Sequence, residues 1–424
     1  MSTATRRSPL TDWTVLVPVV ALVALVFSWG RDLPGFAVVL VSLCLAGAVL
    51  AAVHHAEVVA HRVGEPFGSL VLAVAVTVIE VALIVTLMAD GGDKASSLAR
   101  DTVFAAVMIT CNGIVGLSLL VGALRNRVAV FNAEGSGAAL ATVATLAVLS
   151  LVLPTFTTSK PGPEFSTAQL AFAAVASLAL YGLFVTVQTV RHRNYFLPVD
   201  TSRAAAAAPG DTTSAASAMS ATSAMSTAPA ASGTPAASAA PAASAASGTS
   251  GTSAAPAVSP AAPDDAEHAE PPTARAALIS LGLLLVALIA VVGDAKAVSP
   301  TIEQGVAKAG LPNAVVGVII ALLVLAPETL AAGRAARRDR VQTSLNLAYG
   351  SAIASIGLTI PAIALASIWL SGPLMLGLAP IHMVLLALTV VVSALTIAPG
   401  RATLLQGGVH LVLLAAYLFL AVSP

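Results

Sequence analysis

Long apolar runs recur along almost the whole sequence, and they constrain the fold more than any other feature. Hydrophobic residues make up 57% of the chain and charged residues only 9%, whereas soluble domains average roughly 45–50% and 25%. A helix of about 20 apolar residues crosses the hydrocarbon core of a bilayer. The sequence therefore predicts a membrane protein built from spanning helices. Its net charge of zero gives no reason to expect a nucleic-acid partner.

Hydropathy predicts eleven such helices, so the expected fold class is an all-α polytopic membrane protein. The predicted helices cover residues 13–29, 35–53, 68–89, 103–124, 138–153, 168–190, 275–292, 312–333, 342–369, 379–397 and 403–421. Between the sixth and the seventh, the chain consists mainly of Ala, Ser, Thr, Pro and Gly. Such a composition cannot bury a core, which predicts a disordered linker. The expected domains are an N-terminal region (1–34), a first transmembrane repeat (35–199), the linker (200–273) and a second repeat (274–424).

The distribution of Lys and Arg predicts how the chain crosses the membrane. With the N-terminus in the cytoplasm, 14 of the 20 basic residues fall on the cytoplasmic side, as the positive-inside rule requires. This orientation places the N-terminus and the linker in the cytoplasm, in a multi-pass protein of the cell inner membrane. After the first helix, two groups of five helices then run in opposite directions. That arrangement is the inverted repeat of many secondary transporters, which bind their substrates at the repeat interface.

Each half carries one glutamate inside an apolar run: Glu80 and Glu328. A carboxylate in hydrocarbon costs several kcal/mol unless it meets a proton, a cation or a polar cavity. Both acids lie on the second helix of their half, so the pattern predicts one cation pathway between the halves. The alternative is that each acid is simply protonated and bonded to a neighbouring helix.

Other oxygen atoms are available near these acids. Thr77 lies one turn before Glu80, and Asn112 and Ser351 lie on the small, polar helices that follow the two acids. Ca²⁺ takes six to eight oxygen ligands, and a carboxyl group in low dielectric is readily protonated. A cation and protons would therefore compete for the same oxygens, which is the chemistry of an antiporter. Four further polar residues are interpreted as helix-packing residues, with a ligand role as the alternative: Thr110, Ser118, Asn346 and Ser355.

Two segments carry a resemblance to a known family: HHAEVVAHRVGEPFGSLVLAVAVTVIEVALIV and APETLAAGRAARRDRVQTSLNLAYGSAIASIGLTIP. They resemble the ChaA-type calcium/proton antiporters of the cation/calcium exchanger superfamily. The resemblance implies two inverted repeats, a cation site between the third, fourth, eighth and ninth helices, and exchange of a cation for protons. It also implies that Glu80 and Glu328 are the ion-binding acids and that Gly350-Ser351 is the Gly-Ser pair of the ninth helix.

The chain departs from that family just ahead of each acid, where members commonly have a Gly-Asn pair. Here those places hold Val76-Thr77 and Val324-Leu325, and Asn112 replaces a small hydroxyl residue. The resemblance makes Ca²⁺ the favoured substrate. Because oxygen ligands set ion preference, the missing Gly-Asn pairs make Na⁺ or K⁺ exchange the alternative. No cofactor is expected beside the transported ions and protons, and the sequence predicts no oligomeric state.

A second polar cluster follows the predicted second helix and contains His54, His55, Glu57, His61 and Glu65. His54, Glu57 and His61 share one helical face. The cluster is interpreted as an interfacial polar cap or as a proton-access route, in which Glu57, His54 and His61 take part. A transition-metal site is a third interpretation.

Two other classes of protein fit the sequence less well. An intramembrane metal-dependent enzyme would need a second helix with His or Cys ligands, but His382 and His410 are isolated. A channel is disfavoured by the inverted halves and the paired buried acids. The sequence thus predicts a transporter rather than an enzyme.

Overall fold

The computed structural model describes residues 13–31, 33–64, 67–90, 96–198, 272–312, 314–369 and 372–423. The predicted linker lies outside these residues except for positions 272 and 273, and Glu65 lies outside them as well. Within the described part of the chain, nine helices are long and apolar enough to cross a membrane. Two shorter apolar helices, Trp13–Ser28 and Val74–Ala89, accompany them.

The first half of the chain contains six of the eleven predicted helices. The first three are α1 (Trp13–Ser28), α2 (Gly35–Val63) and α3 (Phe67–Asp90). The fourth is a continuous helix made of α4 (Leu98–Met108), η3 (Ile109–Ile114) and α5 (Val115–Asn126), and the fifth is made of α6 (Ala133–Ala147), η4 (Val148–Val152) and α7 (Leu153–Phe156). The sixth is made of α8 (Thr167–Thr186) and η5 (Val187–Arg191). The segments η3, η4 and η5 are π-helical turns. A short 3₁₀ helix, η6 (Arg193–Phe196), comes next.

The second half supplies the other five helices. They are α11 (Ala274–Lys308), α12 (Ala314–Arg337), α13 (Val341–Ala366), α14 (Pro380–Ile397) and α15 (Leu404–Val422). The predicted all-α fold class is thus confirmed. The predicted ends of two helices were wrong, because α2 continues ten residues past 53 and α11 continues to Lys308. Polar residues in these extensions lower the hydropathy, but they do not interrupt the helical backbone.

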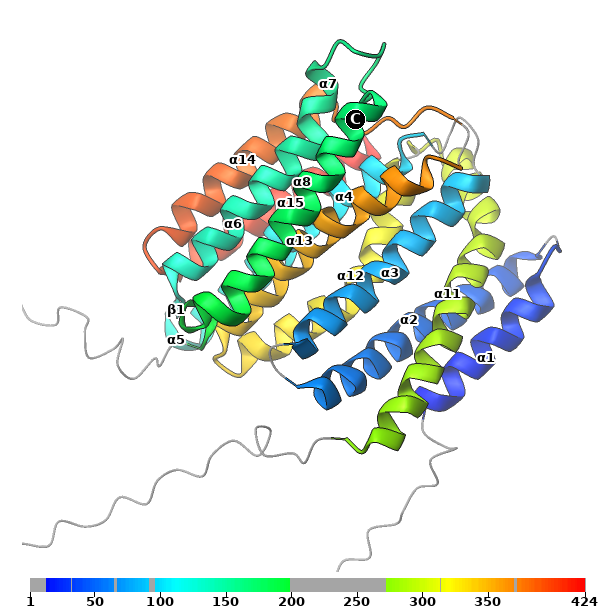
Figure 1. The fold of residues 1–424 in the computed structure, drawn as a ribbon, viewed down its shortest axis with the longest axis horizontal. Helices are drawn as coiled ribbons and strands as arrows, with labels where there is room; N and C mark the ends of the chain where they lie inside the picture. The colour runs from blue at the N-terminus through cyan, green and yellow to red at the C-terminus, as the bar shows by residue number, and fades with distance from the viewer. Residues whose placement is uncertain are drawn as a thin grey trace, which may run out of the picture. The chain divides into compact units, whose positions relative to one another are not determined.

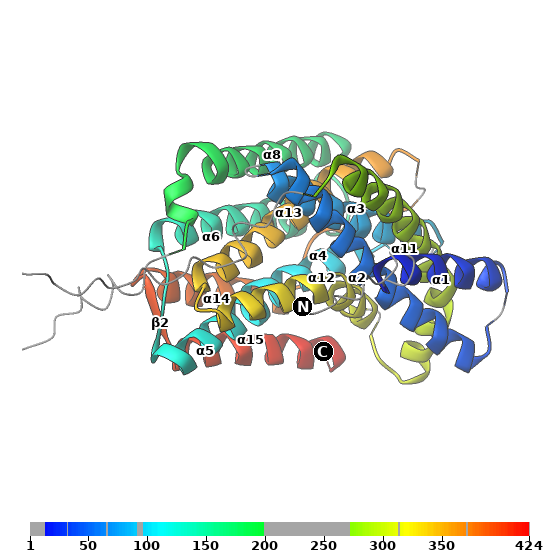
Figure 2. The same ribbon diagram turned by 90° about the horizontal axis from the view of Figure 1, so that it is seen from below.

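Helices of one half pack against helices of the other half, and the contacts correspond in pairs, as an inverted repeat predicts. In the first half, α3 packs on α13, and in the second half α12 packs on α4. The last helix of each half behaves in the same way, since α8 lies along α13 and α15 lies along α5. The first helices, α2 and α11, lie side by side, with α1 against both (Figures 1 and 2).

Loops of the two halves also pair with each other, once at each end of the helices. We call the end that holds residues 198 and 272 the linker end, and the opposite end the distal end. At the linker end, β1 (Val128–Val130) pairs antiparallel with β2 (Arg401–Thr403). At the distal end, an isolated bridge joins Glu164 to Met375. Each pairing joins a loop of one half to a loop of the other.

The helices that carry the two glutamates lie between two apolar cores. One core joins α1, α2 and α11, and the other joins the helices from α4 to α8 with α13, α14 and α15. Both α3 and α12 contribute side chains to each core. Large apolar side chains such as Val26, Phe172 and Val391 are exposed on the outside of the helices, as expected for surfaces that face lipid.

Candidate cation site

A cavity of about 400 Å³ lies among five of the helices. Its lining comes from α2, α3, α8 with η5 and η6, α12 and α13. Both predicted ion-binding acids, Glu80 on α3 and Glu328 on α12, line this cavity. The structure therefore brings together two carboxyl groups that are 248 residues apart in the sequence.

Both acids are almost completely buried. Glu80 is 5% exposed and Glu328 is 7% exposed. The hydroxyl of Ser355 on α13 donates a hydrogen bond of 2.7 Å to Oε1 of Glu80. Among the described residues, Oε2 of Glu328 has no hydrogen-bond partner. A buried carboxyl oxygen without a donor needs a proton, a cation or water, so Glu328 offers a free ligand to an ion that enters the cavity.

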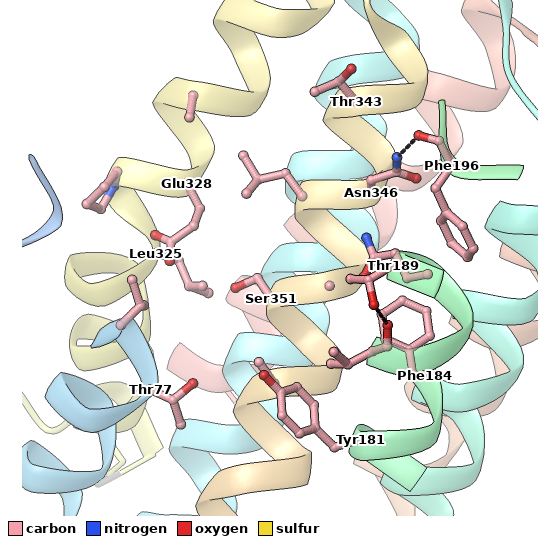
Figure 3. A pocket seen from close by; sticks show the side chains of 18 of the residues that line it. Thr77, Tyr181, Phe184, Thr189, Phe196, Leu325, Glu328, Thr343, Asn346 and Ser351 are labelled. Atoms are coloured by element: carbon pink, nitrogen blue, oxygen red, sulfur yellow. Dashed lines mark hydrogen bonds between the residues drawn. The ribbon is translucent and has the colours of Figure 1, made fainter. Parts of the chain in front are cut away.

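Three of the predicted ligands lie beside the acids. Thr77, Gly350 and Ser351 all line the cavity. Figure 3 shows Thr77 from α3, Glu328 from α12 and Ser351 from α13 around one space between these helices. A side chain at Gly350 would meet no atom within 4 Å, so this glycine leaves open space rather than allowing two helices to touch.

The structure places Asn112 in a different environment. Its side chain does not line the cavity; Nδ2 donates to Oγ1 of Thr389 at 3.0 Å, and Oδ1 accepts from Nδ1 of His410 at 3.2 Å. Asn112 belongs to the π-helical segment η3 and is fully buried. Its amide therefore joins helix η3 to α14 and α15 in this conformation.

The cavity extends from the acids toward the linker end. Its lining continues through Glu57 near the end of α2 and Thr343 near the start of α13 to the exposed Arg193. On the distal side of the acids, Leu83 on α3 and Ile320 on α12 are buried in the apolar core. Among the described residues, the lining of this cavity thus reaches an exposed side chain at the linker end.

The polar cluster on α2 does not act as one unit. Glu57 lines the same cavity as Glu328. His54 packs against the ring of Trp13, and His61 is exposed. The ring of His55 bonds the backbone oxygen of Thr14 at 2.9 Å. Among the described residues, no three His, Cys, Asp or Glu side chains are grouped as a metal site would need.

Ser355 is the contact that sequence reasoning missed, because it was assigned to helix packing. A signal was present in the spacing: Ser355 follows Ser351 by four residues, so both hydroxyl groups lie on one face of α13. The same applies to Asn346, which lines the cavity and donates to the backbone oxygen of Phe196 at 2.6 Å. The other two packing assignments agree with buried contacts: Ser118 bonds Ser344, and Thr110 bonds the backbone of its own helix.

Comparisons with known proteins place these features in a family. The model of the family "Sodium/calcium exchanger protein" matches residues 33–190 and 279–423. The chain is 39% identical to the putative ionic transporter y4hA of Sinorhizobium fredii, over 99% of this chain and 98% of that protein. It is 31% identical to the sodium-potassium/proton antiporter ChaA of Escherichia coli, over 96% of this chain and 95% of that protein.

Solved structures share the fold at low sequence identity. The H⁺/Ca²⁺ exchanger CAX matches with a TM-score of 0.61 at 13% identity, over 96% of this chain and 86% of that one. The native structure of YfkE matches with a TM-score of 0.60 at 13% identity, over 95% of this chain and 96% of that one. These matches confirm the predicted architecture, and the relatives' names describe transporters rather than enzymes. The chain belongs to the sodium/calcium exchanger protein family, in the cation/calcium exchanger superfamily that its sequence resembles.

Proposed function

We propose that this protein is a proton-driven cation antiporter that exports Ca²⁺. The observation that carries the proposal is that two buried carboxyl groups line a single cavity. Each comes from the second helix of its half. Glu80 and Glu328 would bind the cation together with oxygen atoms of Thr77 and Ser351. Water in the cavity and the backbone beside Gly350 would complete the six to eight ligands that Ca²⁺ takes.

Charge balance explains how such a site couples two fluxes. Two carboxylates neutralise one divalent cation, so the occupied site carries little net charge into the low-dielectric interior. After the cation leaves, two bare carboxylates in the same interior would repel each other, and protons neutralise them at lower cost. One site therefore holds either the cation or protons, and each crossing in one direction requires the other species to cross in return.

The orientation of the chain gives the transport a direction. The basic residues favour a cytoplasmic linker end in the inner membrane, so the cavity would face the cytoplasm. The site would then load the cation from the cytoplasm, where the linker and N-terminus would lie. Glu57, at the same end of the cavity, would attract cations and pass protons toward Glu328.

Sodium or potassium exchange is the second candidate, and two observations favour it. The relative ChaA, at 31% identity, is named a sodium-potassium/proton antiporter. The positions before the two acids, Val76-Thr77 and Val324-Leu325, supply only one side-chain oxygen between them. A site with fewer oxygen ligands replaces less of the water that an ion loses on binding. Because a monovalent cation loses its water at lower cost than Ca²⁺, such a site suits Na⁺ or K⁺ better.

Ion flux in everted membrane vesicles tests the proposal. A pH gradient is imposed, and Ca²⁺, Na⁺ or K⁺ is added in turn while the gradient is followed with a fluorescent dye. We expect Ca²⁺ to dissipate the gradient in vesicles that contain the wild-type protein. A response to Na⁺ or K⁺ without a response to Ca²⁺ would select the second candidate, and no response to any of the three would refute both.

Matched variants show whether the two acids form the site. Glu80→Gln and Glu328→Gln keep the shape of the side chain but remove its charge, and each should abolish exchange. Glu134→Gln is the control, because Glu134 lies at the start of α6, outside the cavity. Full Ca²⁺ exchange in either cavity variant would remove that residue from the site.

A further inference from the structure

A short pattern occurs once in each half, at the end of the first helix of the half. The pattern is a glutamate, a glycine seven residues later and a proline two residues after the glycine. In the first half it is Glu57, Gly64 and Pro66, and in the second half it is Glu303, Gly310 and Pro312. Each member is separated from its counterpart by 246 residues, which is within two residues of the separation between the two buried acids.

The backbone repeats along with the sequence. Gly64 ends α2 with φ of 77°, and Gly310 follows the end of α11 with φ of 70°. These are values that glycine adopts far more readily than other residues. Each glycine N–H bonds a carbonyl in the last turn of its helix, that of Ala60 or that of Ala307. The next helices in the chain, α3 and α12, are both 24 residues long. The two glutamates therefore hold equivalent places in the inverted halves, at opposite ends of the bundle.

The surroundings of the two glutamates differ in one respect. Glu57 lines the cavity at the linker end, and Glu328 lines the same cavity. Glu303 is half-buried at the distal end, outside the cavity, and Oε1 accepts a hydrogen bond of 2.9 Å from the hydroxyl of Ser299. The repeat thus places a carboxylate at each end of the bundle, and the cavity that holds Glu80 and Glu328 extends to the one at the linker end.

We propose that Glu303 is the distal counterpart of Glu57: a carboxylate that guides cations between the distal surface and the Glu80–Glu328 site when the cavity opens at that end. This inference rests on the proposed function. The chemistry is electrostatic, because a carboxylate at the mouth of a low-dielectric cleft raises the local concentration of cations and their rate of entry. The hydroxyl of Ser299 keeps the carboxylate oriented while the distal end is closed. Glu303 acts on entry and release rather than as a ligand of the central site.

Transport measured from each side of the membrane tests this assignment. Everted vesicles present the linker end to the added ion, and right-side-out vesicles present the distal end. The ion is Ca²⁺, and the readout is the concentration that gives half-maximal proton flux. Glu303→Gln should raise that concentration roughly threefold or more in right-side-out vesicles and leave it unchanged in everted ones. Glu57→Gln should show the opposite sidedness.

Two controls keep the result interpretable. Glu164→Gln removes a carboxylate from a distal loop that contributes nothing to the cavity, and it should change neither value. Glu303→Asp keeps the charge and should restore most of the wild-type value. The effect of Glu303→Gln should also shrink at high ionic strength, because salt screens exposed charges.

The outcomes separate this inference from the proposed function. If the wild-type protein moves none of the ions tested, the proposed function fails first. If the wild-type protein transports Ca²⁺ but Glu303→Gln changes both sides equally, or neither side, the distal role of Glu303 is refuted while the central site stands.

Discussion

Ser355 on α13 donates a 2.7 Å hydrogen bond to Oε1 of Glu80 on α3, so the buried acid of the first half is held by the second half. Ser355 itself is 3% exposed. A hydroxyl donor stabilises the ionised form of a carboxyl group relative to its protonated form. In the proposed transporter, this contact would therefore favour the form of Glu80 that binds a cation over the form that binds a proton.

Removing this hydroxyl should make protons better competitors. We expect Ser355→Ala to raise the half-saturating Ca²⁺ concentration, and to raise it more at acidic than at alkaline pH, because the protonated form of Glu80 gains at the expense of the ionised form. The measurement is a series of Ca²⁺ titrations across pH in everted vesicles. Ser355→Thr keeps the hydroxyl and serves as the control. An increase that is the same at every pH would contradict a role in proton competition.

Asn112 and Ser351, which lie on the helices that follow the two acids, should respond in different ways. Asn112→Ala leaves Thr389 and His410 without their amide partner, which costs about 1–3 kcal/mol of stability, and the half-saturating Ca²⁺ concentration should stay unchanged. Ser351→Ala should leave stability intact and weaken Ca²⁺ binding. Thermal unfolding in detergent and Ca²⁺ titration of transport measure the two effects. If Asn112→Ala weakened Ca²⁺ binding as much as Ser351→Ala, the amide would have to reach the ion in another conformation.

Two adjacent glycines on α15 offer a matched test of close helix packing. A methyl group at Gly407 would lie 2.7 Å from the backbone nitrogen of Leu120 on α5, whereas one at Gly408 would meet nothing within 4 Å. Gly407→Ala should cost about 1–3 kcal/mol, because backbone atoms must move apart. Gly408→Ala makes the same change in helix propensity without the clash. Thermal unfolding of both variants is the measurement, and equal stabilities would mean that α5 and α15 are not held this closely.

Asp294 on α11 should tolerate loss of its charge. It is fully buried, and among the described residues neither carboxyl oxygen has a hydrogen-bond partner. An unpartnered charge in that setting costs far more than a neutral side chain of the same shape. Asp294→Asn should therefore change the free energy of unfolding by less than about 1 kcal/mol and leave Ca²⁺ exchange intact. Loss of exchange in a variant that still folds would show that Asp294 binds a proton or an ion during the transport cycle.

The helices and the two acids could be predicted because both leave strong signals in sequence. Apolar runs of spanning length mark the helices, and a glutamate inside such a run has few explanations. The ends of α2 and α11 were less predictable, because each helix continues beyond its apolar, membrane-spanning segment. Hydropathy reports where the hydrocarbon stops, whereas the backbone continues to Gly64 and to Gly310.

The neighbours of the site were harder to predict, since they depend on which face each helix presents. The π-helical turn at Ile109–Ile114 adds a residue to the helix and rotates the residues after it. A count based on 3.6 residues per turn cannot locate Asn112 across such a turn. On α13 the backbone is α-helical throughout, and there the spacing of Ser351 and Ser355 does give the right face.

The volume of the cavity bears on where the protein selects one ion over another. A space of about 400 Å³ has room for on the order of ten water molecules, at roughly 30 Å³ each. In the proposed transporter, water in this volume would surround a cation on its way to the two acids. There, Glu80 and Glu328 would replace part of the water around the ion, and selectivity would be decided at that step. Substitutions near the linker end should consequently change how fast ions arrive, whereas the choice among ions depends on the few oxygen atoms around the two acids.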